Sequence, residues 1–126
     1  MALNLNNIML GSSDPKQLAD FYSKVLGAPN PDWSDEANGW FGFQAADGSL
    51  AIGPHSEVGG KNKEPGRIML NFSTSDVKGE FERIKGLGTQ VVAEPYSPGE
   101  GMVMCTFADP DGNYFQLATP WEPQGS

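Results

Sequence analysis

The chain has little that would suit a secreted or membrane-bound protein. Its 126 residues include one cysteine, Cys105, which cannot form an internal disulfide. No apolar run is long enough to cross a bilayer. The N-terminal residues have neither the basic start nor the apolar stretch of a secretory signal, so we expect a cytoplasmic protein.

Basic residues are also scarce. Eight lysines and arginines stand against sixteen acidic residues, which gives a net charge of -8. This charge repels phosphate backbones and anionic lipid heads, so we expect neither nucleic acid nor a membrane as a partner. It would favour a cationic ligand only if carboxylates line a pocket, which composition does not show. Solubility is the simpler interpretation.

The first half contains signals for a strand, a helix and a hairpin. Asp14 followed by Pro15 is typical of a helix start. Asp47-Gly48 is typical of a hairpin turn, and a short strand around Trp33 is weakly marked. From these signals and the apolar spacing, we expect a strand over 3–11, a helix over 15–26 and strands over 40–46 and 49–54.

The second half repeats these signals about sixty residues later. Ile68-Met69-Leu70 echoes Ile8-Met9-Leu10, and Asp76 echoes Asp14. Such a repeat indicates a duplicated unit. Proline and glycine within 109–113 fit a turn between the last two strands. The expected elements are a strand that starts at Ile68, a helix over 77–87 and strands over 90–94, 102–108 and 113–118.

We therefore predict one α+β domain made of two successive βαβββ units. A chain of this size can bury a core without disulfides or metals. Glycine, lysine and proline without periodicity mark the connection between the units. The predicted boundaries are a first unit over about 3–55, a linker over 56–66, a second unit over 67–119 and a tail over 120–126.

Two segments resemble the vicinal oxygen chelate superfamily, which contains glyoxalase I, bleomycin resistance proteins and extradiol dioxygenases. They are IMLGSSDPKQLADFYSKVLGAP in the first half and FADPDGNYFQLATP near the end. The resemblance covers nearly the whole chain. It implies that the two units form a cup with the helices outside and a small organic ligand inside. The cup closes within one chain or by exchange of halves with a second chain, and we expect a homodimer.

Strand alternation predicts which side chains face this cup. With Ile8 and Leu10 under the helix, the alternate residues of the first strand face inward, and the same holds for the first and last strands of the second half. The methionines are either core or a compliant lining for a ligand. The tryptophans are either core or aromatic walls. The predicted ligand-binding residues are Asn7, Met9, Trp33, Trp40, Met69, Asn71, Met104, Tyr114 and Gln116.

The metal positions of the superfamily are poorly matched. Carried over from the resemblance, they fall on Asn7, Met69 and Gln116, with the remaining one near 51–53. Divalent ions prefer carboxylate or imidazole ligands, and these residues supply no anion. We therefore expect no cofactor, with a divalent metal as the alternative. His55, the single histidine, is expected in a solvent-facing loop unless a strand slip brings it toward the cup.

The resemblance leaves three functions open. The first is metal-independent binding or sequestration of a small, partly aromatic molecule. The second is a lyase, isomerase or dioxygenase in which a metal polarises two adjacent oxygens of the substrate. The third is a non-catalytic interaction subunit. Nucleophilic catalysis has little support, because Cys105 lies among apolar residues and far in sequence from His55, and no catalytic residue is assigned.

Overall fold

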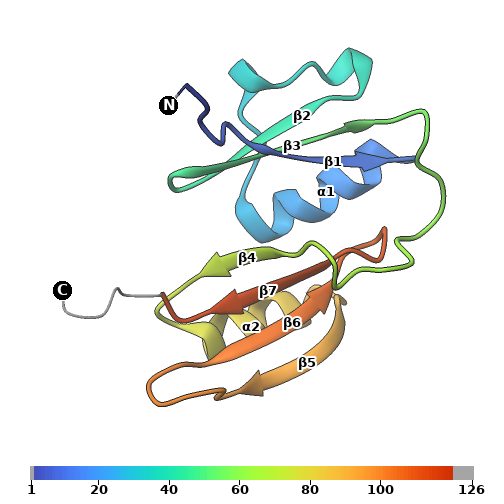
Figure 1. Ribbon diagram of the computed structural model, residues 1–126. Helices are drawn as coiled ribbons and strands as arrows, with labels where there is room; N and C mark the ends of the chain where they lie inside the picture. Colours follow the sequence, from blue (N-terminus) through green and yellow to red (C-terminus); the bar gives the residue numbers. More distant parts are fainter. Residues whose placement is uncertain (1, 121–126) are drawn as a thin grey trace. The chain divides into compact units, whose positions relative to one another are not determined.

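The computed structural model describes residues 2–120. The chain forms two compact units, Met1–Gly60 and Lys61–Ser126. Each unit packs one helix against one sheet, which confirms the predicted α+β class (Figure 1). Within residues 2–120, no helix is long and apolar enough to span a membrane. From residue 121 on, the predicted tail lies outside the described residues.

The first unit contains a helix and a three-stranded sheet. Its elements are β1 (Ile8–Ser12), α1 (Pro15–Leu26), β2 (Phe41–Ala45) and β3 (Gly48–Pro54). β3 lies in the centre, parallel to β1 and antiparallel to β2. α1 has the predicted bounds, because the Asp14 carboxylate accepts a hydrogen bond from the Gln17 backbone N–H at 3.2 Å and caps the helix.

The strand expected around Trp33 is absent, and that prediction is wrong. The 3-10 helices η1 (Pro31–Trp33) and η2 (Glu36–Asn38) occupy this segment. The Asn30 side chain accepts a hydrogen bond from the backbone two residues later, which favours a turn over an extended strand. The segment still follows β2, since the backbone N–H of Asn30 donates to the Gly42 carbonyl at 2.7 Å. The first unit is therefore βαββ with an irregular edge segment.

The first strand is shorter than predicted. Leu3 and Leu5 are 95% and 87% exposed, and the strand begins only at Ile8. Ile8 pairs with Leu50, two residues from the start of β3 at Gly48. Residues 2–5 therefore extend past the end of their neighbouring strand and have no ladder to join.

The hairpin between β2 and β3 turns one residue earlier than predicted. Ala45 pairs with Gly48, so Ala46 and Asp47 form the two-residue loop. Ala46 has a φ of 54°, in the left-handed region. This conformation costs a residue that has a Cβ atom about 1 kcal/mol. The Asp47-Gly48 signal misplaced the turn because this glycine closes the strand pair.

Replacing Ala46 by glycine is expected to raise the free energy of unfolding by about 0.5–1 kcal/mol, because glycine adopts a positive φ without a Cβ clash. Urea denaturation followed by circular dichroism measures the change. Ala45→Gly, one residue earlier in β2, is the matched control and is expected to destabilise the protein. A less stable Ala46→Gly protein would contradict the assigned loop.

The second unit has the complete βαβββ order that was predicted. Its elements are β4 (Leu70–Ser73), α2 (Val77–Lys85), β5 (Gln90–Tyr96), β6 (Met104–Ala108) and β7 (Tyr114–Ala118). The strand order is β4-β7-β6-β5. α2 ends at Lys85 and not at Leu87, which is 43% exposed and does not join the core.

The predicted turn between the last two strands is confirmed. The Asp109 carboxylate is buried and accepts hydrogen bonds from the backbone N–H groups of Asp111 at 2.9 Å and Asn113 at 3.0 Å. Gly112 has a φ of 81°, a conformation that glycine adopts without strain because it has no Cβ atom. These contacts fix the entry of the chain into β7.

The core of the second unit centres on three phenylalanines. The Phe107 ring lies 5.3 Å from that of Phe81 on α2 and 5.4 Å from that of Phe115 on β7, between ring centroids. These contacts identify the sheet face that α2 covers. In each unit we call the face opposite the helix the open face. In the first unit the buried side chains of Phe41 and Phe43 lie under α1, so their neighbour Gly42 belongs to the open face.

Candidate functional site

The predicted site residues of the second unit gather on its open face. Asn71 of β4 is the register partner of Gln116 on β7, and Gln116 is in turn the partner of Thr106 on β6. These residues form a polar row across three strands. Met104 and Tyr114 occupy the same face two residues away on their strands, and Met69 lies half-buried just before β4.

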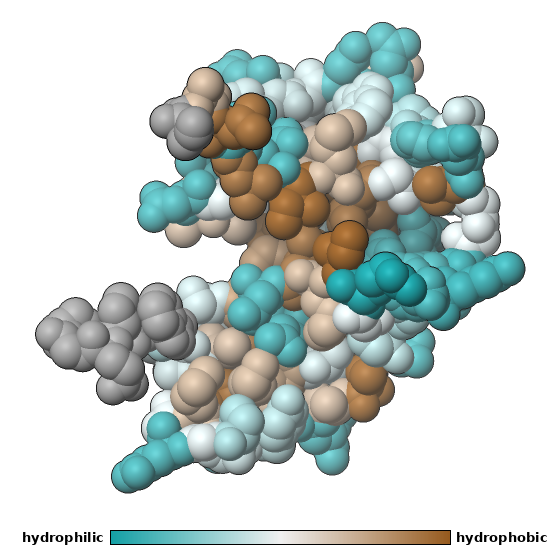
Figure 2. Space-filling model, in the orientation of Figure 1, coloured by the Kyte–Doolittle hydropathy of each residue, from teal (hydrophilic) through white to brown (hydrophobic). Residues whose placement is uncertain are grey.

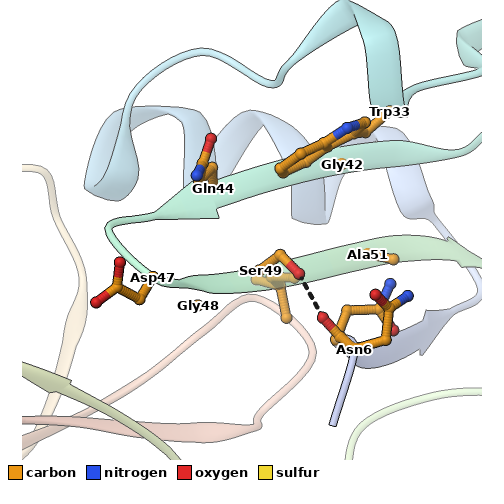
Figure 3. Close-up of a pocket in the computed structure, with 10 residues that line it drawn as sticks. Asn6, Trp33, Gly42, Gln44, Asp47, Gly48, Ser49 and Ala51 are labelled. Atoms are coloured by element: carbon orange, nitrogen blue, oxygen red, sulfur yellow. Dashed lines mark hydrogen bonds between the residues drawn. The ribbon is translucent and has the colours of Figure 1, made fainter. Parts of the chain in front are cut away.

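A pocket of about 400 Å³ opens in the first unit. It is formed by the residues before β1, by η1 and by the β2–β3 hairpin (Figure 3). Two of the predicted site residues, Asn7 and Trp33, line it. Met9 and Trp40 are not among its lining residues, although Met9 lies on the open face beside Ala51, which does line the pocket.

Gly42 determines where Trp33 lies. A Cβ atom on Gly42 would come within 2.6 Å of the Trp33 carbonyl oxygen and 2.7 Å of its Cβ atom. Only glycine therefore allows η1 to cross β2 so closely. The Gly42 backbone N–H also donates to the Ser34 hydroxyl at 3.0 Å, which holds the crossing in place. The Trp33 side chain remains 51% exposed, so its ring is free to contact a ligand.

Trp40 has a different role from Trp33. A Cβ atom on Gly53 would collide with the Trp40 ring, so the indole lies flat against this glycine of β3. Trp40 is half-buried and packs on the sheet outside the pocket. Of the two predicted aromatic walls, only Trp33 faces the pocket.

Small or polar residues of β2 and β3 line the pocket beside Trp33. Ala51 pairs with Gly42, and Ser49 pairs with Gln44. The Ser49 hydroxyl donates to the Asn6 carbonyl at 2.9 Å and joins the chain before β1 to β3 (Figure 3). Gln44 and Ser49 were not among the predicted site residues. Their signal is the alternation within the hairpin, because residues between buried apolar positions must face the other way.

The residues present do not fit a metal site. Within residues 2–120, no three or more His, Cys, Asp or Glu side chains are grouped so that they could hold a metal ion. Asn7 and Gln116 carry neutral amides and Met69 a thioether, and Ala51 offers no side-chain donor. Such a set supplies none of the anionic or imidazole ligands that divalent ions prefer.

His55 lies beside β1 and is exposed. A Cβ atom on Gly11 would come within 3.0 Å of the His55 Cβ atom, so the loop after β3 covers this glycine. The His55 Nδ1 atom accepts a hydrogen bond from the Glu57 backbone N–H at 3.1 Å. That bond leaves the proton of the neutral ring on Nε2. The side chain thus organises its own loop, and it does not line the pocket.

Cys105 lies in the core of the second unit and is fully buried. Burial raises the pKa of its thiol, and a backbone hydrogen bond with Leu117 lowers it by less. The thiolate, which is the nucleophilic form, is therefore disfavoured in the folded protein. The predicted interpretation of this residue as a core thiol agrees with its position.

The Cys105 thiol is expected to react with a disulfide reagent more than about a hundredfold faster in urea than in buffer, because reaction requires opening of the core. The folded state also holds the thiol proton more tightly than the unfolded state. This contribution to stability is therefore present below the unfolded-state pKa of about 8.5 and is lost as the pH rises above it. Rapid labelling of the native protein at pH 7 would contradict the buried assignment.

Comparison with known proteins extends these findings. A family model described as a glyoxalase-like domain matches residues 7–118. No curated protein sequence matches the chain.

Solved structures with the same fold include the following three. A glyoxalase/bleomycin resistance protein/dioxygenase family enzyme from Burkholderia phytofirmans has a TM-score of 0.75 at 17% identity, over 93% of this chain and 98% of that chain. The fosfomycin resistance protein FosX from Mesorhizobium loti has a TM-score of 0.71 at 23% identity, over 96% and 95%. A FosX mutant from Listeria monocytogenes, complexed with Mn(II) and dihydroxypropylphosphonic acid, has a TM-score of 0.73 at 22% identity, over 93% and 90%.

Proposed function

Because the chain belongs to the glyoxalase-like domain family, we propose that it binds a small, partly aromatic organic molecule without the help of a metal ion. The observation that carries this proposal is the Trp33 ring, which is half-exposed and held over Gly42 at a pocket of about 400 Å³. This volume falls in the range of pockets that hold small ligands.

The chemistry of the pocket suits such a ligand. The exposed Trp33 indole offers a flat apolar surface for stacking on an aromatic ring. The amides of Asn7 and Gln44 provide donors and acceptors that would fix the orientation of polar substituents. The small side chain of Ala51, which also lines the pocket, leaves room above the sheet for the ligand.

The donor set supports the proposal that binding is independent of metal. The Listeria FosX protein in the comparison holds Mn(II), and it shares the fold with this chain at 22% identity. The metal positions that the resemblance implies fall on Asn7, Met69 and Gln116, with the remaining one near 51–53, and none of these residues is anionic. This favours binding or sequestration over the metal-dependent lyase, isomerase or dioxygenase reactions.

The second unit contributes further residues to the proposal. Four residues on its open face are proposed ligand contacts, together with the residue just before β4. They are Asn71, Met104, Tyr114 and Gln116, with Met69 before the strand. Asn71→Ala and Gln116→Ala are expected to weaken binding of any ligand that reaches this polar row. Val92→Ala on β5, whose side chain is 39% exposed, serves as a control outside the proposed contacts.

Screening of aromatic small molecules by quenching of tryptophan fluorescence tests the proposal. Trp33→Phe is expected to abolish most of the quenching, whereas Trp40→Phe leaves it largely intact. Trp121 lies outside the described residues, and Trp121→Phe in both proteins removes its signal. Elemental analysis of the same protein, purified without chelators, is expected to find no stoichiometric metal. Quenching that needs an added metal ion would refute the proposal.

We also propose a cytoplasmic homodimer. Residues 1–13 contain no charged side chain, in a chain of net charge -8. This segment includes the exposed Leu3 and Leu5, and Figure 2 shows apolar surface beside this end of the chain. Two copies of an acidic protein repel each other least where they carry no charge, and β1 is an edge strand of its three-stranded sheet.

The double change Leu3→Asp and Leu5→Asp is expected to convert the dimer to a monomer, because it places like charges on the apolar segment. Analytical ultracentrifugation measures the mass of the particle. Lys78→Asp on α2 is a control that also adds negative charge. A dimer that survives the double change, or a wild-type monomer at high concentration, would contradict the proposal.

A further inference from the structure

The charges of the first unit are divided between the two faces of its sheet. Residues 2–60 contain seven acidic side chains, two lysines, Lys16 and Lys24, no arginine, and the single histidine, His55. Both lysines belong to α1, on the helix-covered face. Lys16 is bound to Asp20 of the same helix at 2.7 Å. Within the described part of this unit, the open face therefore has no lysine or arginine, and His55, beside Gly11, does not line the pocket.

The pocket lies on this open face and carries one charged group. Asp47, at the tip of the β2–β3 hairpin, is the single ionisable residue that lines it (Figure 3). The other lining side chains are neutral, and among them Trp33 exposes half of its surface. The face of an indole ring attracts cations through its quadrupole. A carboxylate and an exposed indole thus act on a ligand in the same direction.

We infer that the occupant of this pocket is an organic cation, an ammonium compound with an apolar or aromatic body. The inference rests on the proposed binding function and names the chemical class of its ligand. An anion would meet the Asp47 carboxylate and no lysine or arginine, so no opposite charge among the lining residues would offset the loss of its hydration. The phosphonic acid in the Listeria FosX complex is of the class that this pocket disfavours.

Three probes of similar size distinguish the charge preference. Benzyltrimethylammonium, benzyl alcohol and benzylphosphonate share a benzyl group and differ in charge. The ammonium probe is expected to bind about 3- to 10-fold more tightly than the alcohol, the combined effect of one ring and one exposed carboxylate. The phosphonate is expected to bind more weakly than both. Titrations followed by the Trp33 indole N–H resonance provide the affinities, and added salt should weaken only the ammonium probe.

Matched variants assign the effect to Asp47. Asp47→Asn is expected to weaken the ammonium probe about 2- to 5-fold and leave the alcohol unchanged. Asp20→Asn changes the net charge equally but lies on α1, so it should have no effect on either probe. Gln44→Lys, at an exposed position of the pocket lining, is expected to invert the order and favour the phosphonate.

The outcomes separate the two proposals. If the alcohol or the phosphonate binds as tightly as the ammonium probe, the cation preference is overturned and the pocket remains a binding site. Equal losses in Asp47→Asn and Asp20→Asn would also overturn it, because the effect would then come from net charge alone. If no probe shifts the Trp33 resonance and no other aromatic molecule quenches the tryptophan fluorescence, both the cation preference and the proposed binding function fail.

Discussion

Replacing Phe107 by alanine is expected to lower the free energy of unfolding by about 3–5 kcal/mol, the largest effect of any single change proposed for this protein. Its ring is fully buried and stacked between those of Phe81 and Phe115. Removing it leaves a cavity between α2 and the sheet that the neighbouring rings cannot fill. Urea denaturation followed by circular dichroism measures the loss.

Val92→Ala is the control for Phe107→Ala in the same sheet. Val92 is 39% exposed, and its truncation should cost less than about 1 kcal/mol. The pocket of the first unit should keep its ligand affinity in both variants under native conditions, because all its lining residues precede residue 60. Similar losses of stability in both variants would contradict the central position of Phe107.

Replacing Gly42 by alanine is expected to lower the free energy of unfolding by about 1–3 kcal/mol and to abolish ligand binding in the first unit. The new Cβ atom would meet the Trp33 backbone, which cannot rotate away as a side chain can. η1 must then lift from β2 and carry the Trp33 ring away from the pocket. Fluorescence of Trp33, together with ligand titration, reports the displacement.

Gly48 supplies the matched control. It lines the same pocket and lies on the neighbouring strand, but a Cβ atom there would be 3.6 Å from the Ala45 carbonyl oxygen, an ordinary contact distance. Gly48→Ala should therefore preserve both stability and binding. If Gly42→Ala bound ligand as well as Gly48→Ala does, the close crossing of η1 over β2 would be wrong.

Those elements whose signals are local could be predicted from the sequence. The bounds of α1 follow from the Asp14 cap, the apolar stripe and Gly27, all of which act within a few residues. The turn at Asp109 is equally local, because its carboxylate binds the backbone of the next four residues. Repetition of these signals in the second half was enough to predict a duplicated unit.

Other elements depend on contacts between distant segments. The conformation around Trp33 is set by Gly42 on a strand that forms later in the chain, and no pattern near Trp33 indicates it. The apolar alternation of Leu3 and Leu5 predicts a strand, but β3 begins only at Gly48 and does not extend alongside them. A strand requires a partner, and the position where the partner ends is not encoded in the strand itself.

The site shows the same division. Alternation predicts that Asn71, Tyr114 and Gln116 point away from the helix, and the strand registers agree with that direction. The pocket, by contrast, arises where η1 crosses the hairpin, which the glycine at position 42 permits. The sequence predicts Asp47 only as a turn residue. In the structure its carboxylate lines the pocket, where it would favour a cationic ligand.

The central claim is that the first unit holds a small organic molecule at Trp33 without a metal ion. Titration of the Trp33 signal with benzyltrimethylammonium, performed on the same protein before and after exhaustive treatment with EDTA, tests it most directly. We expect the same saturating curve and the same Kd in both titrations. Loss of binding after EDTA, with recovery on addition of Mn(II), would contradict it.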